Sequence, residues 1–160
     1  MLGITHVVVG ASLGVVAAKS GLIPALPIAI VAIVAASGAL LPDIDHPKSA
    51  FGRRMRVISI PISAIFGHRG ITHSLLAVAA MSLALVFFAH GDGKTPVIAA
   101  LALGYLSHLL ADAMTVSGIP LLWPRKTVFR VPGTGFRTGG YAEVLVCAVA
   151  FGLAALSVTP

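Results

Sequence analysis

Histidine and acidic side chains recur at a few points of an otherwise apolar chain. Residues 43–46 read DIDH, and residues 68–73 read HRGITH. His108 and Asp112 are four residues apart, so a helix would place both on one face, where they could hold one ion. Imidazole and carboxylate ligands suit zinc, with manganese or iron as alternatives. The single cysteine, Cys147, excludes a cysteine-rich metal site.

The elements that must position these side chains are long and apolar. The chain is 58% hydrophobic and only 10% charged, with a mean hydropathy of +1.01, whereas a soluble domain carries about 25% charged residues. Uninterrupted apolar stretches of about 17–21 residues, the length of a membrane-spanning helix, occupy 2–18, 22–41, 71–90, 96–116 and 141–158. We therefore predict an all-α polytopic membrane bundle of about five transmembrane helices, forming a single domain over residues 1–160.

Residues 57–66 form a sixth apolar piece that is too short to span a bilayer. It contains Pro61 and follows three arginines, Arg53, Arg54 and Arg56. We interpret this piece as an interfacial or re-entrant segment, and the arginines as contacts to lipid headgroups. Gly10 and Gly14, spaced as in a GxxxG motif, would let the first span approach a neighbouring helix closely.

The distribution of basic residues predicts the orientation. With five spans, the loops 42–70 and 117–140 lie on the same side as the N-terminus, and they hold all eleven lysines and arginines except Lys19 and Lys94. The positive-inside rule then places the N-terminus in the cytoplasm and the C-terminus outside. This rule also accounts for the pI near 10.3, so no direct binding of nucleic acid is expected.

On this topology the histidines and acids gather at the cytoplasmic ends of the spans, except for His90 and Asp92. Ionisable groups at membrane depth are costly and usually mark function. The candidate metal ligands exceed one tetrahedral shell, so one to three ions are expected; they are His6, Asp43, His46, His68, His73, His108 and Asp112. Asp45 is a candidate catalytic group, although Asp45 and His46 could each be a ligand or could support the ligands from outside. Glu143 is either the partner of an arginine or a general base or metal ligand, and Arg69 could neutralise a phosphate.

A family resemblance supports this interpretation. The sequences LPDIDHPKS at 41–49, HRGITHS at 68–74, HLLAD at 108–112 and LLWP at 121–124, together with His6 and GYAE at 140–143, resemble the YdjM-like family. Its members are described as metal-dependent hydrolases of the bacterial inner membrane, some of them LexA-regulated. The family is distantly similar to zinc-dependent phospholipase C and P1 nuclease, which are helical enzymes with a His/Asp zinc site. The resemblance implies a His/Asp metal cluster that acts on phosphoesters.

The function predicted from these observations is hydrolysis of a phosphoester at the cytoplasmic face, with a phospholipid as one candidate substrate and membrane lipids as partners. Bound metal would polarise the phosphoryl oxygen and lower the pKa of a bound water. A divalent metal transporter is the main alternative, although its ligands should lie near mid-membrane. A regulatory membrane protein without catalytic activity is the third possible function, after the hydrolase and the transporter. A metal-free phosphatase of the phosphatidic-acid type is disfavoured, because Leu101-Ala102 stands where that class needs Ser-Arg. The oligomeric state stays open.

Overall fold

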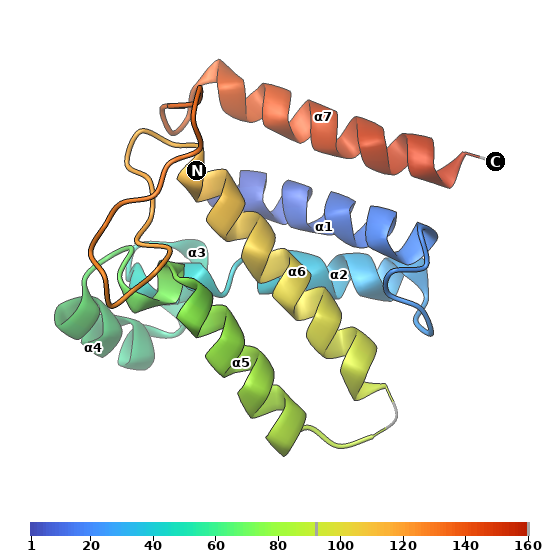
Figure 1. Ribbon diagram of the computed structural model, residues 1–160, viewed down its shortest axis with the longest axis horizontal. Coiled ribbons are helices and arrows are strands. Elements are labelled where there is room, and N and C mark those ends of the chain that lie inside the picture. Colours follow the sequence, from blue (N-terminus) through green and yellow to red (C-terminus); the bar gives the residue numbers. More distant parts are fainter. Residues whose placement is uncertain (92, 160) are drawn as a thin grey trace.

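The computed structural model describes residues 1–91 and 93–159, and over these residues the chain is all-α, as predicted. Seven α-helices and two short 3-10 helices follow one another in the described part, and no strand lies between them (Figure 1). The α-helices are α1 (Gly3–Lys19), α2 (Ile28–Gly38), α3 (Ala50–Arg54), α4 (Arg56–Phe66), α5 (Leu75–Phe88), α6 (Lys94–Ala113) and α7 (Tyr141–Val158). The 3-10 helices are η1 (Pro42–Asp45) and η2 (Ile71–His73).

Each of the five predicted apolar stretches forms a helix, but the helices differ in length. Three segments of the described chain are long and apolar enough to cross a membrane: Ile28–Asp45, Lys94–Ala113 and Tyr141–Val158. The apolar helices α1 and α5 are shorter, with 17 and 14 residues. The second stretch was expected to begin at residue 22, yet α2 begins at Ile28, directly after Pro27. A proline fits the start of a helix but disrupts its interior, which explains the later start.

Close approaches between small residues hold the bundle together. Helix α1 packs against α2, α6 and α7, while α6 also packs against α2 and α5. A side chain added at Gly10 would lie 2.8 Å from Cβ of Ala39, and one at Gly14 would lie 3.0 Å from Cα of Ala32. The predicted close approach of the first span is therefore confirmed, and its neighbour is α2.

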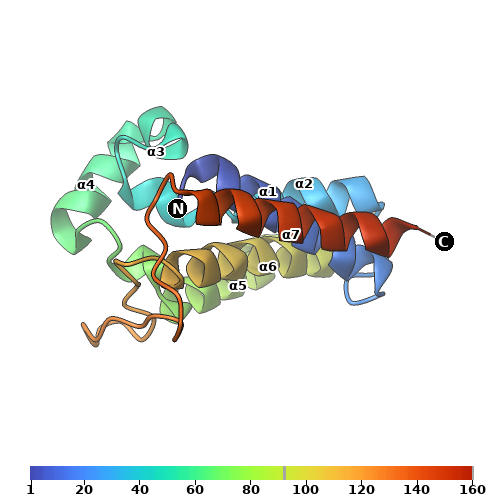
Figure 2. The same ribbon diagram turned by 90° about the horizontal axis from the view of Figure 1, so that it is seen from above.

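The connecting segments that carry the polar residues gather at one end of the bundle. The N-terminus, α3, α4 and the loop between α6 and α7 all lie at the left of Figure 1, whereas the C-terminus and the α1–α2 and α5–α6 loops lie at the other end. The view from above shows the same arrangement (Figure 2). His90 belongs to that second end, and Asp92 lies outside the described residues.

Candidate metal centre

Helix α6 contributes the first two side chains of the site. His108 and Asp112 are both buried, and Nε2 of His108 lies 3.9 Å from Oδ2 of Asp112, so the predicted pairing on one helix face is confirmed. Nδ1 of His108 lies 2.7 Å from the carbonyl oxygen of Ala39, at the end of α2. Since that nitrogen donates its proton to the carbonyl, Nε2 carries a free lone pair, and this atom faces the other polar groups.

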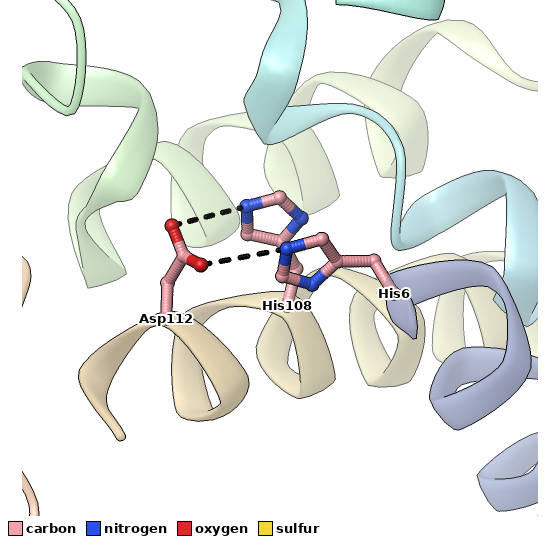
Figure 3. Close-up of side chains that lie close together, drawn as sticks. All are labelled: His6, His108 and Asp112. Carbon is pink, nitrogen blue, oxygen red and sulfur yellow. Dashed lines mark ion pairs between the residues drawn. The ribbon is translucent and has the colours of Figure 1, made fainter. Parts of the chain in front are cut away.

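Helix α1 brings His6 to the same place. Its Nε2 lies 3.4 Å from Oδ1 of Asp112, and its ring stacks on His108 with centroids 3.6 Å apart (Figure 3). His6 is almost fully buried, and its Nδ1 has no hydrogen-bond partner in the described part of the chain. A buried ring nitrogen without a hydrogen bond is energetically costly, so Nδ1 of His6 is an unsatisfied polar atom that a ligand could satisfy.

The segment between α2 and α5 completes the cluster. Nε2 of His73, in η2, lies 3.2 Å from Nε2 of His108 and 3.7 Å from Oδ2 of Asp112. Oδ1 of Asp43, in η1, lies 4.0 Å from Nε2 of His108. Two overlapping groups result, His6 with His108 and Asp112, and Asp43 with His73 and His108; within each group the donor atoms all lie within 4.8 Å of one another.

These atoms suit a divalent cation. Zinc binds imidazole nitrogen at about 2.0–2.1 Å, so two donors on one tetrahedral ion are about 3.3 Å apart. The separations of 3.2 to 4.0 Å between donor atoms are close to that value. His108 belongs to both groups, yet only its Nε2 is free. A single nitrogen lone pair binds one ion, so the two groups either share an ion or compete for His108.

Asp45 supports the cluster from behind. This carboxylate is fully buried and accepts hydrogen bonds from Nδ1 of His68 and Nδ1 of His73, at 3.0 and 3.1 Å. It also accepts from the hydroxyl of Thr72 and, at 3.0 Å, from the backbone amide of Arg69. A carboxylate on one ring nitrogen fixes the tautomer of a histidine and directs the other nitrogen to a metal. These contacts agree with the supporting place that the sequence left as one of the alternatives for Asp45, while its role in catalysis stays a prediction.

Arg69 lies at the edge of the cluster in a constrained conformation. Its Nη2 lies 2.8 Å from Oδ2 of Asp112, and its Nη1 donates to Oγ1 of Thr115 and to the carbonyl of Gly118, at 3.3 and 3.4 Å. The backbone of Arg69 has a φ of +61°, which lies in the left-handed region that residues other than glycine rarely adopt. Because strained residues persist only where neighbours hold them, the fixed guanidinium is a candidate functional group.

His46 and His68 lie farther out. Their rings are 4.5 Å apart, and the side chain of His68 is 44% exposed. Burial lowers the pKa of His46, and the nearby His68 acts in the same direction. Five of the seven predicted ligands therefore form the two groups, all of them buried except the partly exposed Asp43, and His46 and His68 lie at the rim.

Glu143 lies apart from the predicted ligands, between the start of α7 and the start of α1. At the start of α7, it accepts hydrogen bonds from the amide of Leu2 at 3.0 Å, the hydroxyl of Thr5 at 2.7 Å and the amide of Gly139 at 3.0 Å. Among the described residues, its hydrogen-bond partners include none of the predicted ligands. It fastens the start of α7 to the start of α1, while a role as general base stays a prediction.

Several groups of the site were not identified from sequence. Thr72 lies between the two histidines of residues 68–73, and this position was its only signal. The hydroxyl of Tyr105 donates to the carbonyl of Thr72 at 2.7 Å and so supports η2. The carbonyl of Ala39 and the terminal amino group of Met1, which pairs with Asp112, are backbone groups that no residue pattern reveals.

A cavity of about 640 Å³ adjoins the cluster. Its polar wall includes Asp43, Arg69 and Asp112, and the two rim histidines also line it. Its apolar wall is formed by Leu2, Ile4, Val7, Leu40 and Phe51. This volume lies within the range of small-molecule sites, about 300–1,000 Å³. The cavity can therefore accept a ligand that has both a charged and an apolar part.

The fold and the site define a multi-pass helical membrane protein with a buried His/Asp cluster at one end. The sequence model described as YdjM inner membrane protein matches residues 1–159, and the chain belongs to this family of inner membrane proteins. It is 48% identical over 115 residues to the inner membrane protein YdjM of Escherichia coli, an alignment that covers 70% of this chain and 58% of that protein. The chain thus spans less than two thirds of that relative.

A second relative covers more of the chain. YvsG of Bacillus subtilis is 40% identical over 152 residues, which make up 92% of this chain and 88% of YvsG. The inner membrane protein YbcI of Escherichia coli is 34% identical over 91 residues, or 54% of this chain and 49% of YbcI. No solved structure matches the chain. The predicted family and the location in the inner membrane are confirmed by the family match.

Proposed function

We propose that this protein is a membrane-embedded, metal-dependent hydrolase that acts on a phosphoester at the cytoplasmic face. The observation that carries the proposal is the His/Asp cluster beside a cavity: three imidazoles and two carboxylates lie together, and Arg69 lines the cavity next to the two carboxylates. A divalent cation held there, zinc in the first place and manganese or iron as alternatives, would polarise the phosphoryl group and activate water.

Arg69 is placed to bind the anionic part of a substrate. Its guanidinium is held by Asp112, Thr115 and Gly118 and still lines the cavity. Guanidinium groups bind phosphate oxygens with charge-assisted hydrogen bonds, often two at a time. Because its side chain is already ordered, little conformational entropy would be lost when the phosphate binds.

His68 is placed to move a proton. Its Nδ1 is held by Asp45, and its half-exposed ring lines the cavity. The opposite nitrogen, Nε2, is therefore free to accept or donate a proton there. The apolar wall of the cavity favours a substrate with an acyl chain beside its phosphate, and this supports a phospholipid among the candidate phosphoesters.

The test is metal analysis of the purified protein, followed by hydrolysis assays with phosphomonoesters, phosphodiesters and phospholipids, with and without zinc or manganese. We expect bound metal and metal-dependent turnover, both lost in the His108→Ala/Asp112→Ala variant. His90→Ala removes a histidine at the other end of the bundle and should retain both.

Other results would replace the proposal. Metal uptake into sealed vesicles without turnover would identify a divalent metal transporter. Metal bound without either turnover or uptake would leave a non-catalytic, regulatory role, and a metal-free protein would remove the basis of the proposal.

A further inference from the structure

The polarity of helix α4 is reversed with respect to a helix on a water-exposed surface. Its protein-facing side carries Ser59, which is fully buried and whose hydroxyl has no hydrogen-bond partner in the described residues. Its outward side carries apolar residues: Val57 is 90% exposed and Ile65 is 73% exposed. A helix at a water interface turns its apolar side inward. The outer face of α4 therefore requires an apolar surrounding, which in an inner membrane protein is the acyl region of the bilayer.

Positive charge lies directly beside this apolar face. Arg53, Arg54 and Arg56 stand at the junction of α3 and α4, and all three are exposed. None of them forms an ion pair within the described residues, and residues 46–67 contain no aspartate or glutamate. An exposed apolar helical face next to unpaired arginines is typical of a helix that lies in the plane of a membrane with anionic lipids.

The α3–α4 segment is firmly attached to the rest of the site. It contacts η1, which carries Asp43 and Asp45, and a side chain added at Gly52 would lie 2.1 Å from the carbonyl oxygen of His46. The end of α4 at Phe66 is separated from His68 and Arg69 by Gly67 alone. Both views show α3 and α4 at the end of the bundle that holds the N-terminus (Figures 1 and 2). A lipid bound to α3–α4 therefore lies close to the cluster.

We propose that α3–α4 (residues 50–66) is an in-plane membrane helix pair that binds anionic phospholipids. Arg53, Arg54 and Arg56 bind the headgroup phosphates, and the outer face of α4 lies among the acyl chains. The proposal is independent of hydrolysis, because it rests on the surface of α4 and not on the metal cluster. It implies that the cavity beside the cluster adjoins a patch of leaflet enriched in anionic lipid.

Lipid selectivity tests the headgroup contacts. Full-length protein is placed in nanodiscs of mixed phosphatidylcholine and phosphatidylglycerol, and the lipids retained on the released protein are counted by native mass spectrometry. In the Arg53→Gln/Arg54→Gln/Arg56→Gln variant, we expect the preference for phosphatidylglycerol to fall about tenfold, since each basic residue contributes to attraction by an anionic surface. The control Arg125→Gln/Lys126→Gln/Arg130→Gln removes the same charge from exposed residues of the α6–α7 loop and should keep the preference.

An equal loss in both variants would show general attraction by net positive charge and would overturn the proposal. An unchanged preference in the first variant would overturn it as well. Both variants leave every residue of the His/Asp cluster in place, and helical content by circular dichroism together with the midpoint of thermal unfolding serves as the check on folding.

Depth measurement tests the position of α4. In a Cys147→Ser background, an environment-sensitive fluorophore is attached to Val57→Cys or, for comparison, to Lys48→Cys, which precedes α3. Lipids brominated on the acyl chain should quench the probe at residue 57 strongly and the probe at residue 48 weakly. Weak quenching at residue 57 would show that α4 faces water, and the proposal would then be wrong.

Discussion

At the scale of single residues, the buried groups of the cluster fall into two kinds. Nε2 of His108 and Nε2 of His73 face each other at 3.2 Å, as metal ligands do. Asp45 is of the second kind, because it contacts Nδ1 of His73 and Nδ1 of His68 and so orients the rings. Metal ligands and the residues that orient them can be distinguished by experiment, since removing an orienting residue weakens metal binding without removing a donor atom.

Asp45→Asn is expected to lower the affinity for zinc by about 10–100-fold, the usual effect of losing a supporting carboxylate. The amide keeps the shape of the side chain but loses its charge and one of its acceptor oxygens. Competition with a fluorescent zinc chelator measures this change. Glu143→Gln makes the same chemical change at a buried carboxylate whose hydrogen-bond partners among the described residues are Leu2, Thr5 and Gly139, so its zinc affinity should stay at the level of the unmodified protein.

Arg69→Ala is expected to weaken the binding of inorganic phosphate to the metal-loaded protein by roughly 1.5–3 kcal/mol, the size of a charged hydrogen bond. Its metal content should not change, because the predicted ligands remain. Isothermal titration calorimetry measures the phosphate affinity. If phosphate binds equally well to both proteins, Arg69 is a structural partner of Asp112 and Thr115 and not an anion-binding group.

At the scale of elements, the contact between α2 and α6 positions the site. A side chain added at Gly104 would lie 1.8 Å from the carbonyl oxygen of Ala35, so the two helices touch through their backbones. One turn farther along α6, Nδ1 of His108 binds the carbonyl of Ala39. The distance between these helices therefore controls whether His108 keeps the tautomer that leaves Nε2 free.

Gly104→Ala is expected to destabilise the protein by about 1–3 kcal/mol, because an overpacked contact forces the backbones apart. It should also lower the zinc affinity, since the hydrogen bond between His108 and Ala39 lengthens. Denaturant-induced unfolding in detergent and chelator competition measure the two effects. Gly152→Ala on α7 has open space around the new side chain and should be neutral or stabilising by about 0.5–1 kcal/mol. Equal stability of the two variants would mean that the close contact is not rigid.

At the scale of the whole molecule, the connecting segments that carry most of the charged residues lie at one end of the helical bundle. The N-terminus, α3, α4 and the α6–α7 loop share one end, and the α1–α2 and α5–α6 loops share the other (Figure 1). This agrees with the grouping of basic residues that predicted a cytoplasmic site, and the orientation itself stays a prediction.

Single cysteines in a Cys147→Ser background test that orientation. A membrane-impermeant thiol reagent applied to intact cells should label Gly93→Cys and leave Ser49→Cys and Thr134→Cys unlabelled until the cells are opened. Labelling of Ser49→Cys or Thr134→Cys from outside would reverse the orientation and place the cluster on the external face.

The sequence determined the helical class, the five apolar helices and the membership of His108 and Asp112 in one site, because these depend on local composition and on the period of a helix. It also identified the residues of both buried groups, since ionisable side chains are conspicuous in an apolar chain. The sequence left open the role of Asp45 and the place of Glu143, because the role of a carboxylate depends on which neighbours contact it.

Only the tertiary structure showed which groups these two carboxylates contact. The folded chain brings Asp45 to His73 and His68, and it joins Glu143 to Leu2, 141 residues away in sequence. The carbonyl of Ala39 and the φ of +61° at Arg69 are backbone features that side-chain patterns do not encode. The reversed polarity of α4 likewise became visible only when packing showed which side of the helix faces the protein.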